Sequence, residues 1–185
     1  QVYGTDIVIP EKIDGMPVKE VTLHNKSLAT LDVSNAIGLV KLDCSNSYDT
    51  AGPKLTSLDL SQNTALQILN CDYNNLTTLN VENLTSLKDF RCVNNQLSTL
   101  DVSKSPALDA LYCDENNLTT LYTGATTLLT MLSCTRNNLV AIDISQNISL
   151  IYIQCNHNPI TALDTTNSPS LRVFMCTDCH LETLD

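Results

Sequence analysis

Tryptophan is absent from this chain, and only two of its 185 residues are phenylalanine. A conventional core of this size uses several large aromatic side chains, so their scarcity indicates a core built from one small unit repeated many times. Basic residues are also few, because 10 Lys and Arg stand against 20 Asp and Glu and give a formal net charge of -10. These bases are scattered along the chain, which excludes a phosphate-binding face, and we expect no nucleic-acid partner.

Long apolar runs are missing as well. No stretch approaches the ~20 apolar residues that a transmembrane helix requires, so we expect no membrane insertion. The chain begins at Gln1 without an initiator Met and without a charged-then-apolar leader. We interpret it as a processed or trimmed fragment, which is compatible with export.

The sequence does contain a repeat of 21 residues. An apolar column consists of Leu66, Leu87, Leu108, Leu129, Leu150 and Leu171. A cysteine column consists of Cys71, Cys92, Cys113, Cys134, Cys155 and Cys176. An asparagine column consists of Asn74, Asn95, Asn116, Asn137 and Asn158. Chance does not align several columns through so many periods, so the repeat defines how the chain is organised.

The repeat also extends upstream of these columns. Cys44 belongs to a longer unit with a six-residue insertion near residues 47–54, and a degenerate first unit begins at Val18. We therefore divide the chain into an N-terminal cap, residues 1–17, and a repeat region, residues 18–185. The repeat region holds seven full units and a partial eighth.

The pattern L-x-x-L-x-C-x-x-N-x-L resembles the leucine-rich repeat, and residues 97–103 resemble its 21-residue bacterial class. The Cys slot is similar to the cysteine ladder of internalin-like bacterial surface proteins. The segments at residues 7–10 and 15–18 resemble BspA-like surface repeats. The resemblance implies a right-handed solenoid with parallel strands on its concave face, and an inward Asn that satisfies backbone groups where each strand ends. It also implies an extracellular or cell-surface location and a role in adhesion or recognition.

Alternation within each unit indicates the local structure. Inward and outward residues alternate at residues 69–72, which is typical of a strand, and neighbouring units stack such strands ~4.8 Å apart. The return arm at residues 76–81 also alternates and is too short and Thr-rich for a helix of several turns. We predict a mainly β solenoid with extended return arms and no long helices. Strands are expected near residues 69–71, 90–92, 111–113, 132–134, 153–155 and 174–176.

The cysteines, beginning with Cys44, would lie in register on parallel strands. Their Cβ atoms would then be ~4.7–4.9 Å apart, beyond the ~3.5–4.5 Å that a disulfide requires. We expect reduced, buried thiols that act as small apolar groups. Cys179 occupies the Asn slot and completes a C-x-x-C-H sequence from Cys176 to His180, which matches a c-type haem attachment motif. We favour a match produced by the repeat register, with a Cys176–Cys179 disulfide as an alternative, and we expect no cofactor.

Other candidate chemistry is sparse. His157 and Asp178 fall in one outward column, but no Ser or Cys nucleophile accompanies them, so we expect a solvated pair and no catalytic site. Four acids form a loose column on the return arm: Asp59, Asp101, Asp143 and Asp164. Calcium is conceivable there, but no EF-hand or glycine-rich calcium repeat is present. We expect a solvated charged face and no metal site.

Function is expected at the outward positions of the strands, because stacked parallel strands form an extended curved face. Asn46 and Ser133 fall in these outward columns. Several outward residues are of the types that dominate protein interfaces. They are Tyr73, Arg91, Tyr112, Glu115, Arg136, Tyr152 and His157. The insertion with Tyr48 is a second candidate surface, since long insertions in tight repeats tend to be functional.

These observations favour a non-catalytic recognition module that binds a protein or a glycan through its concave face. The alternative is a structural spacer or stalk. Low aromatic content and the lack of one concentrated apolar patch favour the spacer, whereas the varied outward columns favour recognition more strongly. The last coil would leave apolar residues such as Phe174 and Leu184 uncovered, so we also expect further sequence after Asp185 or end-to-end packing of two chains.

Overall fold

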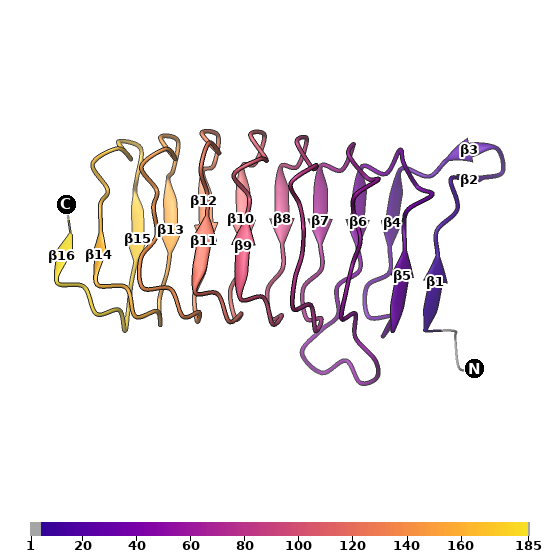
Figure 1. Cartoon of the computed structure of the whole chain (residues 1–185), viewed down its shortest axis with the longest axis horizontal. Coiled ribbons are helices and arrows are strands. Elements are labelled where there is room, and N and C mark those ends of the chain that lie inside the picture. The colour runs from indigo at the N-terminus through magenta and orange to yellow at the C-terminus, as the bar shows by residue number, and fades with distance from the viewer. Residues whose placement is uncertain (1–4, 185) are drawn as a thin grey trace.

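The computed structural model describes residues 5–184, apart from the Leu184 side chain, and in that range every regular element is a β-strand. Successive coils stack in a single row, with the N- and C-termini at opposite ends (Figure 1). The prediction of a mainly β solenoid without long helices is therefore confirmed. The first four residues of the predicted cap, Asp185 and the Leu184 side chain lie outside the described part of the chain.

One strand from each coil joins an eight-stranded sheet in which every neighbouring pair is parallel. The strands are β4 (Glu20–Thr22), β6 (Lys41–Asp43), β7 (Ile68–Asn70), β8 (Asp89–Arg91), β10 (Ala110–Tyr112), β12 (Met131–Ser133), β13 (Tyr152–Gln154) and β15 (Val173–Met175). The six strands for which the repeat pattern predicts bounds, β7, β8, β10, β12, β13 and β15, each begin one residue earlier than predicted. In the register, inward Leu69 pairs with Phe90, so the 21-residue spacing aligns equivalent positions of successive coils.

Further strands of two or three residues pair in parallel along the opposite side of the coils. These are β1 (Asp6–Val8) with β5 (Thr30–Asp32), β9 (Thr99–Asp101) with β11 (Thr120–Tyr122), and β14 (Ala162–Leu163) with β16 (Thr183–Leu184). An antiparallel hairpin, β2 (Lys12–Ile13) with β3 (Met16–Pro17), lies at the N-terminal end. Asp14 and Gly15 have positive φ, as a two-residue hairpin turn requires.

The chain after β6 forms a loop that projects from the row of coils (Figure 1). Its Tyr48 side chain is 84% exposed. Two contacts attach the loop to the preceding coil: the Ser27 hydroxyl donates to the Ala51 carbonyl at 2.7 Å, and the Thr50 hydroxyl donates to Asn25 at 2.7 Å. The insertion is therefore held against its neighbour while its tip stays in solvent.

The cysteine column stacks through the core next to the inward Leu residues. All eight cysteines are free thiols, and those from Cys44 to Cys155 are buried. Several thiols also donate a hydrogen bond to the next strand, as Cys71 does to the Arg91 carbonyl and Cys113 to the Ser133 carbonyl, both at 3.4 Å. Burial raises the pKa of the Cys44 thiol to about 12 and that of Cys113 well above its ordinary value. The ladder cysteines therefore stay protonated and fill a narrow core.

The asparagine column binds one coil to the next. The Asn95 amide donates to the Cys71 carbonyl of the preceding coil at 3.0 Å and to the Cys92 carbonyl of its own coil at 3.2 Å. Its oxygen accepts the backbone N–H of Leu76 at 3.0 Å. The same three contacts recur at Asn74, Asn116, Asn137 and Asn158. The inward role expected for this Asn is therefore confirmed.

Cys179 lies in the slot that Asn fills in the preceding coils. Its thiol donates to the Cys155 carbonyl at 3.3 Å, in place of the amide N–H. A thiol cannot supply the amide oxygen that accepts a backbone N–H elsewhere in the column. Cys176 in turn follows β15 just as each ladder Cys follows its strand, so the C-x-x-C-H sequence coincides with the repeat register.

Asn46 departs from the sequence expectation. The offset from Cys44 places it in the outward column of Tyr73, and its backbone N–H does occupy the equivalent ladder position, donating to Asp72. Its side chain nevertheless turns inward, is buried, and donates to the Asn74 oxygen at 3.0 Å and to the Tyr73 carbonyl at 3.3 Å. Asn46 is therefore a member of the asparagine ladder and was wrongly assigned to the surface.

The structure also contains a buried polar column that the repeat analysis missed, at the opposite bend of the coils. Its members are Asn63, Ser105, Thr126, Asn147 and Ser168. The Asn147 amide donates to the Thr126 carbonyl at 3.1 Å, and the Asn63 amide donates to the Val33 and Ala36 carbonyls at 3.0 Å. Polar side chains thus connect neighbouring coils at both bends.

Replacing Asn116 by Ala should destabilise the solenoid by on the order of 2 kcal/mol. The change leaves the Leu97 N–H without its acceptor, and an unsatisfied buried group costs roughly 1–3 kcal/mol. The Cys92 carbonyl loses one of its two amide donors and keeps the Asn95 amide at 3.2 Å. Urea unfolding followed by circular dichroism measures the loss. Exposed Asn117, changed to Ala, is the control and should alter stability by less than about 0.5 kcal/mol. Equal effects of the two variants would contradict the ladder's role.

Thiol titration should separate the cysteines into two groups. Cys176 and Cys179 are half-exposed and should react promptly with a disulfide reagent, whereas the six buried cysteines should react only after denaturation. Burial slows the reaction of these six thiols in two ways. It blocks the access of the reagent, and it raises the thiol pKa so that little of the reactive thiolate is present. Mass spectrometry of alkylated peptides identifies the sites. Prompt native labelling of Cys92 or Cys113 would contradict a dry ladder.

Candidate functional site

The eight-stranded sheet presents two outward rows, one on each side of the inward residue, which we call the strand face. The row before the inward residue is Lys41, Ile68, Asp89, Ala110, Met131, Tyr152 and Val173. The row after it is Asp43, Asn70, Arg91, Tyr112, Ser133, Gln154 and Met175. Register pairing sets the members of each row side by side, so a surface feature can extend over several coils.

A polar cluster occupies the middle of the strand face. The Arg91 Nε donates to Asp72 Oδ2 at 3.3 Å, and its guanidinium carbon lies 4.3 Å from the centre of the Tyr112 ring. Asp72 is buried, and its Oδ1 accepts the Val93 N–H at 2.6 Å. Burial raises the pKa of Asp72, with the Val93 N–H and Arg91 acting in the opposite direction. Arg91 and Tyr112 are therefore held together, as expected for a preorganised contact surface.

In every second coil, the residue directly after the ladder Cys carries a side chain that accepts a backbone hydrogen bond from the next coil. Asp72 accepts the N–H of Val93, Asp114 that of Thr135 at 2.7 Å, and Asn156 that of Thr177 at 2.7 Å. Asp114 also accepts the Ser133 hydroxyl at 2.6 Å. Ser133 keeps the outward register position expected for it, but this contact covers the side chain and it is buried. The side chains of Asp72, Asp114 and Asn156 thus satisfy backbone N–H groups at the margin of the strand face.

Four of the predicted contact residues lie at the bend after the strands. We call this the bend row: Tyr73, Asn94, Glu115, Arg136, His157 and Asp178, all with φ of 54–57°. From the sequence, these residues were expected at outward positions of the strands themselves. The left-handed turn of the backbone directs the following residue inward, which is Asn after the first five of these positions and Cys179 after Asp178. The bend row is therefore a separate margin beside the strand face.

The bend-row side chains bind one another along the stack. The Asn94 amide donates to Glu115 at 2.8 Å, and Arg136 forms an ion pair with Glu115 at 2.9 Å. His157 and Asp178 approach to 2.9 Å, which confirms that they are a partly exposed pair. Hydrogen bonds from Asn94 and then Arg136 lower the pKa of Glu115. Glu115, Arg136 and His157 thus already have partners within the chain.

An apolar stripe crosses the C-terminal half of the strand face. Ala110, Met131, Tyr152 and Val173 are register neighbours on four successive strands. Two exposed residues widen the stripe, namely Ile151, which is 45% exposed, and Met175, which is 43% exposed. The Tyr152 hydroxyl donates to Gln154 at 2.7 Å and lies 3.6 Å from the Met175 sulfur. This stripe was not identified from the sequence; its four register neighbours are half-buried, and its Ile151 and Met175 are exposed.

The stripe could have been recognised from the sequence, because residues 110, 131, 152 and 173 are spaced by 21 and none of them is charged. Of the seven predicted contact residues, only Tyr152 lies in the stripe. Arg91 and Tyr112 lie beside it on the strand face, and the other four lie in the bend row.

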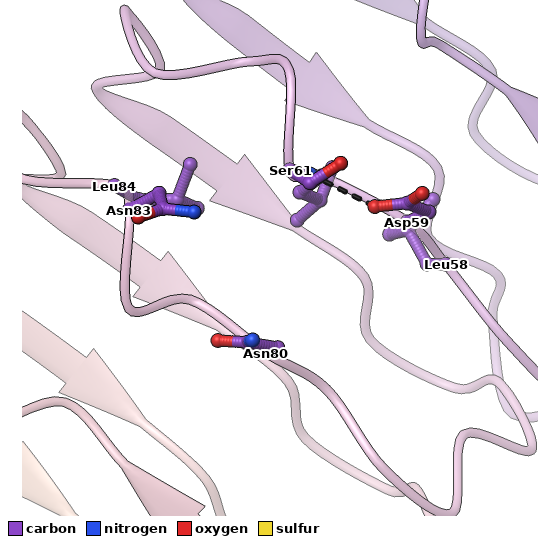
Figure 2. Close-up of a pocket in the computed structure, with 7 residues that line it drawn as sticks. Leu58, Asp59, Ser61, Asn80, Asn83 and Leu84 are labelled. Carbon is purple, nitrogen blue, oxygen red and sulfur yellow. Dashed lines mark hydrogen bonds between the residues drawn. The ribbon is translucent and has the colours of Figure 1, made fainter.

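Several hollows of the surface lie along the return arms, between neighbouring coils. Figure 2 shows one with Leu58, Asp59 and Ser61 on one coil and Asn80 and Asn83 on the next. Its volume of about 60 Å³ is far below that of sites that enclose small molecules, and three larger hollows, of about 280 to 360 Å³, are open to solvent. In the described range, 5–184, no group of three or more His, Cys, Asp or Glu side chains could hold a metal ion. No helix in that range is long and apolar enough to cross a membrane.

The return-arm acids have a structural role that the charged-face expectation did not include. Asp59 accepts the backbone N–H of Ser61 at 2.9 Å, two residues ahead, and so closes the turn (Figure 2). The same contact recurs at Asp32, Asn80, Asp101, Asp143 and Asp164. Hydrogen bonds from residue 61 lower the pKa of Asp59, and equivalent bonds lower those of Asp143 and Asp164. This column therefore stabilises turns.

Comparison with known proteins gives matches among solved structures alone, since no family model and no curated protein matches the chain. The leucine-rich repeat domain of APL1B has a TM-score of 0.60 at 19% identity, over 85% of this chain and 47% of its own. The LRIM1/APL1C complex gives a TM-score of 0.60 at 16% identity, over 96% of this chain and 43% of that one. The functional domain of InlJ from Listeria monocytogenes, which includes a cysteine ladder, is 24% identical over 90% of this chain and 55% of its own, with a TM-score of 0.40.

The chain thus spans about half the length of the solved chains that it matches. The two likenesses with a TM-score of 0.60 show the fold, and the predicted leucine-rich repeat solenoid is confirmed. The stacked column of buried thiols in this structure likewise confirms the predicted cysteine ladder.

Asp72 and Asp143 should respond to pH in opposite ways. The pKa of Asp72 is raised by burial, so its ionised form weakens the fold at neutral pH, and its contribution to stability improves as pH falls through that pKa. The pKa of Asp143 is lowered by the Ser145 hydrogen bonds. Its carboxylate therefore stabilises the fold above the unfolded value, and that contribution is lost as pH falls through the folded pKa.

Urea unfolding of Asp72→Asn and Asp143→Asn between pH 7 and pH 3 tests these signs. We expect Asp72→Asn to be at least as stable as the wild type at pH 7 and to lose any advantage in acid. Asp143→Asn should be the less stable at pH 7 and should converge with the wild type in acid. Parallel pH profiles for the two variants would contradict the assignment.

Proposed function

We propose that this chain is a non-catalytic recognition module that binds a protein partner through its strand face. The apolar stripe is the observation that carries the proposal. Soluble proteins rarely leave Met, Ile, Val and Tyr side chains contiguous on a rigid sheet unless that surface is covered by a partner. Methionine adapts to irregular surfaces, and tyrosine is a frequent anchor at interfaces, so Met131, Tyr152 and Met175 suit the centre of such a contact.

The chemistry of the stripe favours a protein over a glycan. Recognition of sugar hydroxyls requires several directed hydrogen-bonding groups, whereas the stripe offers methyl groups, thioethers and one tyrosine hydroxyl that already donates to Gln154. Arg91 and Tyr112 lie beside the stripe on the strand face and supply polar groups there. The bend row supplies charged side chains where the strands end. An apolar centre with a polar rim is the usual composition of protein interfaces.

The structural spacer remains the second candidate. The hydrogen bonds and ion pairs within the bend row favour it, because they consume charged side chains in contacts along the stack. A spacer needs no exposed apolar stripe, however, and outward positions of other coils show that polar residues are accepted there. For either function we propose an extracellular or cell-surface location, and a capping role for residues 1–17 at the first coil.

A library of displayed random peptides tests the strand-face proposal without a known partner. Most clones enriched on the wild-type chain should carry apolar or aromatic anchors. They should bind at least about tenfold more weakly to the combined variant Met131→Thr, Tyr152→Ser and Met175→Thr, as expected for loss of interface anchors. These positions point outward, so the thermal unfolding midpoint should stay close to that of the wild type.

Lys104→Ala, an exposed change away from the strand face, is the matched control and should leave clone binding unchanged. Clones that bind the triple variant as tightly as the wild type would place recognition elsewhere. A chain that enriches no clones would favour the spacer.

A further inference from the structure

A second apolar patch lies on the return arms, on the side of the coils opposite the eight-stranded sheet. The outward arm positions are mostly Thr, Ser, Asn and Asp, as in residues 77–80 and 98–101. Three successive coils depart from this composition. Their apolar outward residues, which we call the return-arm patch, are Tyr122, Val140, Ala141 and Ala162. Equivalent positions in other coils carry Asp or Asn for Tyr122, and for Val140 they carry Ser or Thr in five other coils, Ala29 in the first coil and Glu182 in the last.

These side chains are in solvent. Tyr122 is 56% exposed and Val140 is 60% exposed, while Leu121 and Ile142 on the same arms face the core. The patch borders a hollow of about 360 Å³ that is lined by Thr119, Thr120, Tyr122, Val140 and Asp143, among others. The core is therefore complete without the patch, and folding does not explain why apolar residues replace Thr and Asp there.

Tyr122 also lacks the carboxylate with which other residues of its column accept the backbone N–H two residues ahead. In the coil before it, Asp101 accepts the N–H of Ser103, and in the coil after it, Asp143 accepts that of Ser145. The next residue, Thr123, is instead bonded to the following coil, where its hydroxyl contacts the Asp143 carbonyl at 2.8 Å and the Asn147 oxygen at 2.8 Å. The Tyr122 side chain itself makes no turn contact of the kind that Asp101 and Asp143 make, and its ring is exposed.

The charges around the patch have one sign. On the four arms at residues 98–101, 119–122, 140–143 and 161–164, the charged residues are Asp101, Asp143 and Asp164. Asp101 is the register neighbour of Tyr122 on β9, and Asp143 belongs to the next coil. Two coil spacings of ~4.8 Å put the carboxylates of Asp101 and Asp143 on either side of Tyr122, roughly 10 Å apart. The net charge of -10 adds a long-range attraction for cations.

We propose that the return-arm patch is a docking site for a basic, extended segment of another protein. An apolar or aromatic side chain of that segment packs between Tyr122 and Val140, and Lys or Arg residues flanking it pair with Asp101 and Asp143. The half-exposed walls of the hollow cannot enclose a small molecule, which favours a polypeptide that lies across the arms. The site is independent of the strand face and of the function proposed for it.

A defined peptide tests the site: acetyl-Thr-Lys-Ser-Phe-Ser-Lys-Thr-amide, titrated into ¹⁵N-labelled protein. Shift changes should centre on residues 119–122 and 140–143. A peptide with Ser in place of Phe, and another with Glu in place of both Lys residues, should each bind at least about tenfold more weakly. Higher salt should weaken binding of the basic peptide, because exposed charge pairs are screened.

Two variants keep the fold and remove one feature each. Tyr122→Asp with Val140→Thr restores the composition of the neighbouring coils and should weaken peptide binding at least about tenfold. Asp101→Asn with Asp143→Asn removes the charge while an amide still closes the turn, as Asn80 does with the N–H of Glu82 at 2.9 Å. This pair should weaken binding roughly three- to tenfold and reduce its salt dependence, since the remaining negative charge of the chain still attracts the peptide.

The strand-face variant Met131→Thr, Tyr152→Ser and Met175→Thr is the control and should bind the peptide as the wild type does. Its failure to bind, or shift changes located on the strand face, would overturn the return-arm site without deciding the strand-face proposal. Unchanged binding by the Tyr122→Asp, Val140→Thr variant would overturn it as well. Circular dichroism of each variant establishes that losses of binding occur in folded protein.

Discussion

The asparagine amide that bonds two coils at once is the constraint on which the rest of this structure depends. Each strand of the eight-stranded sheet is only three residues long, and the backbone groups released at its end must be satisfied inside a narrow core. A single Asn side chain satisfies these groups. It donates to the carbonyls of two successive cysteines and accepts a backbone N–H from the preceding coil. The contact also fixes the spacing between coils, so every outward position repeats with the same geometry. A residue such as Tyr73 takes positive φ because the Asn that follows it must turn inward.

Cysteine suits the neighbouring slot for a related reason. The space between the inward Leu of the strand and the Asn amide is small, and a thiol fills it while still donating weakly to a carbonyl of the next strand, as Cys113 does to Ser133. A larger apolar side chain would push the coils apart, and a hydroxyl would require a stronger partner. The ladder is therefore a packing column whose buried members, from Cys44 to Cys155, should remain unreactive because they are dry and protonated. Its last member, Cys176, is followed by Cys179 in the Asn slot, where the two-coil amide contact is replaced by one thiol hydrogen bond.

The sequence was sufficient to predict the parts of the fold that depend on periodic burial. Core, strand direction and the inward Asn all follow from columns spaced by 21 residues, because only apolar or fully bonded groups can occupy the inside of every coil. The errors have local causes. Counting from Cys44 put Asn46 outside, whereas the insertion that follows it lets the side chain enter the ladder. The φ of His157 depends on bonds made by its neighbour, so spacing alone placed it on a strand. The apolar stripe was missed because charged and aromatic residues were given more weight than the column containing Met131 and Val173.

A repetitive frame makes departures from its own composition informative about function. At an outward position, Thr or Asp on one coil shows what the fold accepts there, so an exposed apolar residue in the same column adds nothing to the core. Ile151 and Met175 on the strand face, and Val140 on the return arm, depart in this way. The two surfaces differ in their surroundings, since the strand face has both Arg91 and acids nearby, whereas the return-arm patch is bordered by acids alone. Partners of different charge therefore fit the two sides, and because each coil contributes to both sides, one short solenoid can hold two partners without either contact altering the core between them.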